Sequence, residues 1–293
     1  MEPTTQSATS RNRISVQQWE QLRPDLAQQL GDSRLQFHHA VQFATAAGIS
    51  YLAPRPDDSH TNLEWVPEFR ALFSRRIPAT KTFRIGVRPA DLTLLVVPEP
   101  PMRIAALGLN GCTITDATSW IRERIVAQGA DSSRYTLNRH YEIPTHPVAK
   151  GAAFDSRGAD SFDELAKWFA NAFAILRNLA RSTPMSSDVR CWPHHFDVGM
   201  LIDATGNRSI GVGLELGDDH YDEPYFYVNM TPQPGVDRVA ELRLDGEGSW
   251  HTNGWIGAVL PGSRLRGNAS QLSQVGGFLD SAIAAAREIV RGD

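Results

Sequence analysis

The chain has 293 residues, of which 41% are hydrophobic, and its 29 basic and 33 acidic side chains give a formal net charge of −4. This composition is typical of a globular protein with one large domain or two smaller ones, and two cysteines are too few for a disulfide framework. The charge offers no basic field for nucleic acid, and no stretch approaches the ~18 consecutive apolar residues that a membrane span needs.

Residues 1–14 are polar, without hydrophobic periodicity and without the apolar segment of a signal peptide, so we expect a disordered tail and a cytoplasmic protein. The capping-box spacing at 15–18 predicts a first helix, which Pro24 limits or restarts. A second helix is predicted over 33–47, with Gly48 as its stop. The loop "APRPDDSHTN" follows.

The hydrophobic period then changes to two, and residues 82–88 and 92–97 predict a hairpin. An amphipathic helix is predicted over 113–128, with Gly129 as its stop, and a longer one opens with a capping box at Ser161 and Glu164 and ends before Pro184. The second half predicts four strands and a final helix, near 191–202, 208–216, 224–231, 250–260 and 268–290.

This order of elements, without regular alternation of strand and helix, predicts an α+β fold with antiparallel sheets and packed helices. We expect residues 15–293 to form one domain. It could consist of two loosely similar sub-units, 15–150 and 151–293. The similar strings "HTNLEW" at 60–65 and "HTNGW" at 251–255 are the only sign of such a duplication.

The stretch "CWPHHFDVGM", residues 191–200, carries two histidines and an aspartate just before an apolar run. If it is one strand, alternate residues face opposite sides of a sheet. His194 then shares the core face with Trp192 and Phe196. His195 and Asp197 share the other face, and their side chains are close enough to act together.

The next two strands extend both faces. Matching the apolar faces of the strands places further polar residues beside His195 and Asp197, namely Glu215, Tyr225, Tyr227 and Asn229. Glycines at 199, 211 and 213 form the floor of this polar face, and glycine inside a strand usually marks a close approach by other atoms. Two alternatives follow: a helix or loop packs tightly on the floor, or a small molecule binds there.

A metal-dependent enzyme is a further alternative to small-molecule binding. His195, Asp197 and the later His251 match the two-histidine, one-carboxylate set of Fe(II) oxygenases, and with Arg264 the order resembles that of 2-oxoglutarate-dependent oxygenases. The acidic loops "PDDSH" and "GDDHYDEP" would instead suit a divalent metal that activates water for hydrolysis. No P-loop, G-x-S-x-G or H-E-x-x-H motif is present.

At "WPHHFD", "RPDDSH" and "EPYFYVNMTPQP" the chain resembles an uncharacterised bacterial family of similar length. The matching positions are Trp192, Phe196, Asp197, Glu223, Pro224, Phe226 and Tyr227. The resemblance implies no established activity. Family members have small residues at the positions of His194 and His195, which argues against an obligatory two-histidine metal site.

Small-molecule binding at the polar face is therefore the function that we expect, by the residues His195, Asp197, Glu215, Tyr225, Tyr227 and Asn229. The alternatives are a metal-dependent enzyme that uses His195 and Asp197, and an interaction protein whose polar face is simply packed. The sequence does not specify the oligomeric state.

Overall fold

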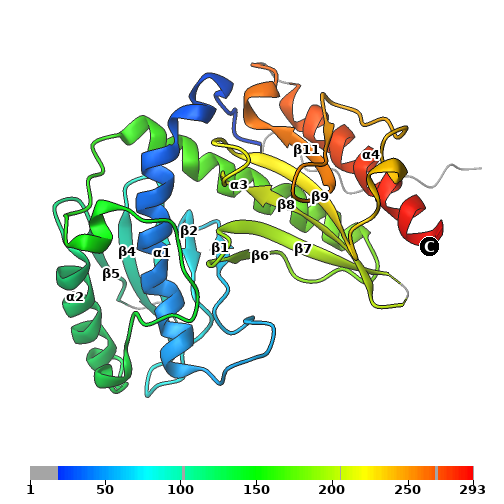
Figure 1. The fold of residues 1–293 in the computed structure, drawn as a ribbon. Helices are drawn as coiled ribbons and strands as arrows, with labels where there is room; N and C mark the ends of the chain where they lie inside the picture. Colours follow the sequence, from blue (N-terminus) through cyan, green and yellow to red (C-terminus); the bar gives the residue numbers. More distant parts are fainter. Residues whose placement is uncertain (1–18, 101–102, 205, 268–269, 293) are drawn as a thin grey trace, which may run out of the picture.

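The structure is a computed structural model that describes residues 19–100, 103–204, 206–267 and 270–292. In these ranges the chain forms two antiparallel sheets with four α-helices packed on them (Figure 1). The helices are α1 (Gly31–Tyr51), α2 (Ile114–Ala127), α3 (Ala159–Ser182) and α4 (Gln271–Gly292). This arrangement confirms the predicted α+β class.

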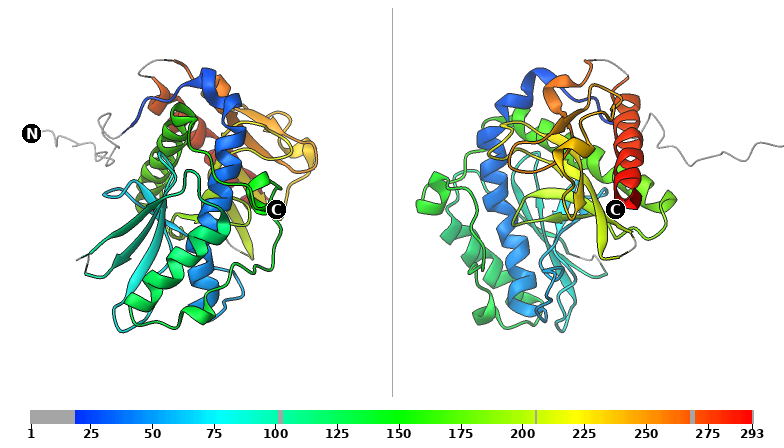
Figure 2. Two further views of the ribbon diagram at one scale, coloured as in Figure 1. Left: turned by 90° about the vertical axis from the view of Figure 1, so that its left-hand side faces the viewer. Right: turned by 45° about the vertical axis from the view of Figure 1, so that its right-hand side comes forward.

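The first sheet has the strand order β1-β2-β3-β4-β5, and α1 and α2 lie on the same side of it (Figure 2). Its strands are β1 (Glu64–Val66), β2 (Ala71–Phe73), β3 (Phe83–Arg88), β4 (Thr93–Pro98) and β5 (Ala105–Gly108). The predicted hairpin is confirmed as β3 and β4, which pair from Phe83↔Pro98 to Arg88↔Thr93. Each strand has one face toward α1 and one away from it, as the period of two requires.

The second sheet has the order β10-β11-β9-β8-β7-β6. Its strands are β6 (Arg190–Trp192), β7 (Asp197–Ala204), β8 (Arg208–Glu215), β9 (Tyr225–Thr231), β10 (Ser249–His251) and β11 (Gly257–Pro261). Two of the four predicted strands, near 191–202 and 250–260, are each divided into two strands by a turn. α3 and α4 pack against the apolar face of this sheet, and one continuous core includes residues of both sheets and all four helices.

Helix α1 packs on one face of the first sheet and is buried all round from Gln36 to Gly48 (Figure 1). Its buried polar side chains bind the backbone of three loops, which satisfies groups that burial would otherwise penalise. His39 Nε2 is 3.0 Å from the Pro144 carbonyl oxygen, and the Gln36 amide accepts from the Asp155 N–H at 2.8 Å. The third loop, at Pro193, belongs to the candidate site.

The predicted first helix is wrong over the described residues 19–23, and residues 1–18 lie outside the described ranges. Side chains of α3 and α4 accept hydrogen bonds from this segment, which is not helical: the N–H groups of Glu20, Leu22 and Arg23 donate to Asn171, Gln271 and Glu164. A 3₁₀-helix, Pro24–Gln29, follows. Glu164 is thus engaged with the N-terminal segment, and α3 begins at Ala159, with Gly158 as its N-cap and without the predicted capping box.

The prediction that Gly129 ends α2 agrees with the structure, where this glycine has a φ of +79°. Thr113 and Asp116 form a capping box at the start of that helix. The final helix, predicted over 268–290, is α4; Asn268 lies outside the described residues. No helix among the described residues is long and apolar enough to cross a membrane.

Gly48 does not end α1 but lies inside it. The loop at His60 runs directly against the helix at this glycine. A Cβ at Gly48 would collide with the His60 carbonyl oxygen, whereas a Cβ at Gly276 in α4 would meet nothing within 4 Å. The helix therefore needs glycine at position 48 for packing rather than for termination.

We predict opposite effects of one substitution at these two helical glycines. Gly48→Ala should lower the free energy of unfolding by about 1–3 kcal/mol through overpacking. Gly276→Ala should raise it by up to about 1 kcal/mol, since alanine is the better helix former. Urea unfolding followed by tryptophan fluorescence measures both, and a stabilising Gly48→Ala would contradict the packing argument.

Candidate functional site

The two adjacent histidines lie in a tight turn, not in a strand. β6 ends at Trp192 and β7 begins at Asp197, and these two residues pair across the hairpin. Phe196 closes the turn with a φ of +70° and donates its N–H to the Trp192 carbonyl at 2.6 Å. Such a φ is uncommon outside glycine, so the prediction of one continuous strand from 191 to 202 is wrong at this point.

Helix α1 holds this turn in place. The buried Phe196 ring stacks on His38, with ring centroids 4.3 Å apart and planes 3° from parallel, and it also contacts Phe37 and Phe169. His38 Nε2 lies 2.8 Å from the Pro193 carbonyl oxygen, which is also an acceptor for Gln42 at 3.2 Å. Burial lowers the pKa of His38 from 6.5 to about 3, so its imidazole is neutral at pH 7 with the proton on Nε2.

The turn separates His194 from the core. His194 is half-buried, with its ring 5.7 Å from that of Tyr141 and 6.1 Å from that of Trp192. Phe196 reaches the core as predicted. His195 is exposed and contacts the His194 ring at 4.4 Å, and among the described residues no hydrogen bond joins it to Asp197.

From Asp197 onward the predicted alternation of faces agrees with the strand pairing. β8 pairs with β9 through Gly211↔Asn229, Gly213↔Tyr227 and Glu215↔Tyr225. Five of the six residues predicted to bind a ligand therefore project from the same face of three neighbouring strands: Asp197, Glu215, Tyr225, Tyr227 and Asn229. We call these five residues the polar face.

The glycines of the floor are needed for side chains of the same face. A Cβ at Gly199 would lie 2.9 Å from the Tyr227 hydroxyl, and one at Gly213 would be nearer still. Gly211 makes the same room for the Asn229 amide. Cross-strand side chains, rather than another helix, another loop or a ligand, thus account for the three glycines, an arrangement known for aromatic residues beside glycine in sheets.

Tyr227, lying across the glycines, reaches Asp197. Its hydroxyl donates to Asp197 Oδ2 at 2.5 Å, and burial with the nearby carboxyl raises the pKa of Tyr227 well above its usual value. Asp197 Oδ1 is buried and has no hydrogen-bond partner among the described residues. The tyrosine therefore remains a proton donor and satisfies only one of the two aspartate oxygens.

Asp197 and Glu215 form a buried pair of acids on neighbouring strands, each only 9% exposed. Burial raises the pKa of both groups, and for Glu215 the charges of Asp197 and Asp218 raise it further. Among the described residues neither acid forms an ion pair, and Arg34, which is near Glu215, pairs with Asp222 at 3.4 Å. The charges of His195 and Arg34 act against this rise in pKa but do not cancel it.

Aromatic rings continue the polar face toward β10. The Tyr225 hydroxyl donates to Asp218 at 2.7 Å, and its ring stacks with that of Trp255 at 6.5 Å. Trp255 also stacks on His251, 4.6 Å away. Sequence reasoning missed Trp255 because it lies in the β10–β11 turn, where no strand period applies.

The three residues of the expected metal site do not come together. β10, which carries His251, is four strands from β7, which carries Asp197, and four spacings of about 4.8 Å separate them by roughly 19 Å. Within the described ranges no group of three His, Cys, Asp or Glu side chains is placed to hold a metal ion, and this includes the two acidic loops. Arg264 lies in a 3₁₀-helix, Gly262–Arg264, after β11.

We predict that His38 makes the stability of the turn depend on pH. The unfolded chain takes up a proton at His38 below about pH 6.5, but the folded chain does so only near pH 3. The stability that His38 provides is therefore present above pH 6.5 and is lost as the pH falls from 6.5 toward 3, by up to about 1.4 kcal/mol per pH unit.

His38→Gln keeps a donor for Pro193 but cannot titrate. Its free energy of unfolding should fall less steeply than that of the unchanged protein between pH 6.5 and 4, measured by urea unfolding at each pH. Parallel slopes in the two proteins would exclude this role of His38.

A second prediction concerns the room that glycine gives to Tyr227. Gly213→Ala should cost about 1–3 kcal/mol of unfolding free energy, because the new methyl group meets the Tyr227 hydroxyl and the Val198 carbonyl oxygen. The control is Gly108→Ala in β5, where a Cβ meets nothing within 4 Å and the change should stay within about 0.5 kcal/mol. Equal effects in urea unfolding would show that the glycines are not needed for Tyr227.

No protein-family model, curated protein or solved structure matches this chain. The family resemblance of the sequence thus stays a prediction. Of its positions, Asp197 and Tyr227 meet in the candidate site, whereas the buried Glu223 accepts hydrogen bonds from the N–H and hydroxyl of Ser263 at 2.6 and 2.9 Å, beside the sheet.

Proposed function

We propose that the polar face binds a small molecule that carries a positively charged nitrogen, such as an amine or a guanidinium group. The observation that carries this proposal is the buried acid pair, Asp197 and Glu215, which forms no ion pair among the described residues. The ligand would supply the positive charge that the protein leaves out.

The energetics of the acid pair favour such a ligand. Two carboxyl groups in a poorly solvated site cannot both ionise at low cost, so in the free protein at least one of them tends to hold a proton. A bound cation would allow both to ionise and would satisfy Asp197 Oδ1, the buried oxygen that lacks a partner. Charge-assisted hydrogen bonds of this kind are about twice as strong as neutral ones.

The neighbouring rings favour an organic cation over a bare ion. Tyr227 and Trp255 are both half-buried; Tyr227 contacts Asp197 directly, and Trp255 stacks with Tyr225, the cross-strand partner of Glu215. The electron-rich faces of tyrosine and tryptophan attract ammonium and guanidinium groups by about 0.5–2 kcal/mol. Because His251 is four strands from Asp197, a metal-dependent enzyme is less well supported.

The test compares cationic ligands with neutral analogues of similar shape. Alkylammonium and guanidinium compounds should raise the melting temperature of the full chain in a concentration-dependent way, since a ligand at 100 times its Kd stabilises by about 2.7 kcal/mol. The corresponding alcohols and ureas should not. Affinity should increase with pH, because the raised pKa values of the acids leave more carboxylate at higher pH.

Three variants separate the site from the general charge of the protein. Asp197→Asn and Glu215→Gln should abolish the rise in melting temperature that the cationic ligand causes. Both variants should fold, because an amide is less costly to bury than a carboxylate. Asp203→Asn is the matched control, since Asp203 lies on the same strand and face but is exposed. Cation binding that survives both buried substitutions, or that Asp203→Asn abolishes, would refute the proposal.

A further inference from the structure

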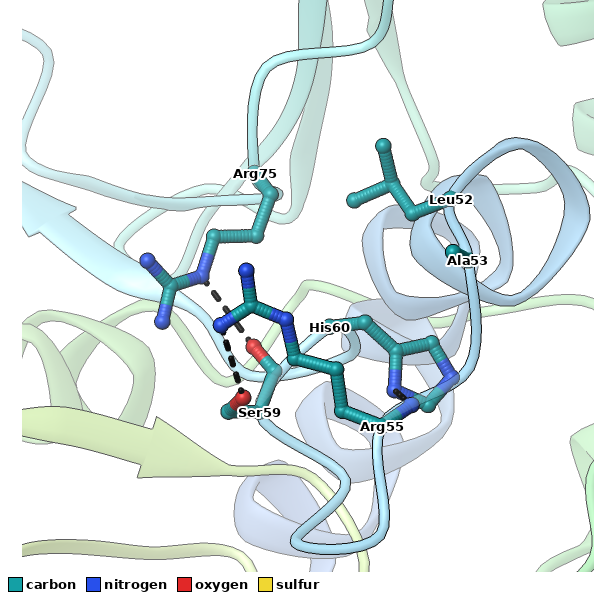
Figure 3. Close-up of a pocket in the computed structure, with 6 residues that line it drawn as sticks. All are labelled: Leu52, Ala53, Arg55, Ser59, His60 and Arg75. Atoms are coloured by element: carbon teal, nitrogen blue, oxygen red, sulfur yellow. Dashed lines mark hydrogen bonds between the residues drawn. The ribbon is translucent and has the colours of Figure 1, made fainter.

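A second site lies outside the polar face, at the end of α1. There a pocket of about 250 Å³ lies between the loop after the helix and Arg75, which is two residues past the end of β2 (Figure 3). Its lining combines two arginines, a serine and a histidine with a short apolar wall: Leu52, Ala53, Arg55, Ser59, His60 and Arg75.

Arg75 is held in place through its Nε. Its Nε donates to the Ser59 carbonyl at 3.2 Å and to Asn62 Oδ1 at 3.0 Å, and Asn62 is itself buried. These two contacts fix the plane of the guanidinium group. Figure 3 shows the guanidinium groups of Arg55 and Arg75 on the same side of the pocket, with Arg55 Nη1 3.5 Å from the Ser59 hydroxyl.

The two arginines of this pocket lie near the charges of Asp57, Asp188 and Glu64 but are not paired with them. Among the described residues neither Arg55 nor Arg75 forms an ion pair, although the whole chain has more acidic side chains, 33, than basic ones, 29. Burial is the main cause that lowers the pKa of Arg75; the charges of Arg190 and Arg55 lower it further, while those of Asp188 and Glu64 raise it.

The acids near the pocket make other contacts, and the charge of Asp57 also acts on Arg55. Asp57 Oδ1 accepts from the Ser59 N–H at 3.1 Å, and Asp58 Oδ2 contacts His140 at 2.9 Å. Arg190, which also lies nearby, pairs with Asp188 at 2.8 Å. None of these contacts neutralises Arg55 or Arg75.

We propose that this pocket binds the oxyanion of a small molecule, a phosphate or a carboxylate group, between Arg55 and Arg75. Planar guanidinium groups bind such oxygens in pairs, and the Ser59 hydroxyl offers a further donor. Leu52 and Ala53 would contact the carbon part of the ligand. The volume is below the ~300–1,000 Å³ of sites for drug-sized ligands, so the organic part must be short.

Calorimetric titration of the full chain tests this site, with inorganic phosphate, glycerol phosphate, acetate and propionate as probes and glycerol as the neutral control. Saturable binding at one site by an oxyanion, weakened by added salt, is the expected result. Phosphates that bind when carboxylates do not would identify a phosphate site, and the reverse would identify a carboxylate site. Binding weaker than about 10 mM for every probe would overturn the proposal.

Substitutions place the binding at this pocket. Arg55→Gln and Arg75→Gln should each weaken binding about 10-fold or more, and Arg55 is exposed, so its replacement leaves the fold intact. Arg76→Gln is the matched control, because it removes the same charge from an exposed neighbour and should change affinity less than about twofold. Equal losses in all three variants would show a general charge effect and no site.

This site and the polar face share no residue. Arg55→Gln should leave the binding of cations unchanged, and Asp197→Asn should leave the binding of oxyanions unchanged. Failure of one proposal therefore does not affect the other.

Discussion

The candidate site depends on one contact, the docking of the Pro193–Phe196 turn on α1. A single stretch of that helix supplies the stacking surface for Phe196 and two nitrogens for the Pro193 carbonyl oxygen. Because Asp197 follows the turn directly, these contacts fix where β7 begins. The same helix packs on β3 of the first sheet, so it joins the two halves and sets the starting point of the polar face at once.

Burial along the polar face follows from this starting point. Asp197, next to the turn, is almost fully buried, whereas Leu201 and Asp203, farther along the same face of β7, are exposed. Tyr227 covers the glycines between these ends and donates its hydroxyl to the buried end. The glycines therefore leave the room that Tyr227 needs, and the hydroxyl of Tyr227 in turn contacts Asp197. A ligand that reached Asp197 would meet a surface made largely by the protein's own side chains.

Sequence periodicity predicted the parts of the fold that local patterns determine. The helices near 113–128 and 161–183, the hairpin at 82–97 and the faces of the strands after Asp197 all follow from apolar spacing. The errors arise where tertiary contacts outweigh local preference. Gly48 and Glu164 carry ordinary helix-boundary signals, but a passing loop and the N-terminal segment determine their roles. The turn at Phe196 has a positive φ, and tertiary contacts such as the stacking of its buried ring on His38 stabilise it.

The polar face was predictable because alternation in strands is local, but its chemistry was not. Whether an acid is paired depends on its surroundings in the fold: the buried Glu164 forms an ion pair with Lys167, whereas the buried Asp197 and Glu215 form none among the described residues. Arg70 and Glu20 form an ion pair at 2.6 Å, as do Arg157 and Asp155, where water already screens the charges and pairing contributes little. Asp197 and Glu215 lie where an ion pair would contribute most, yet neither forms one among the described residues. An unpaired charge is costly in such a place, and a ligand of opposite charge would remove that cost.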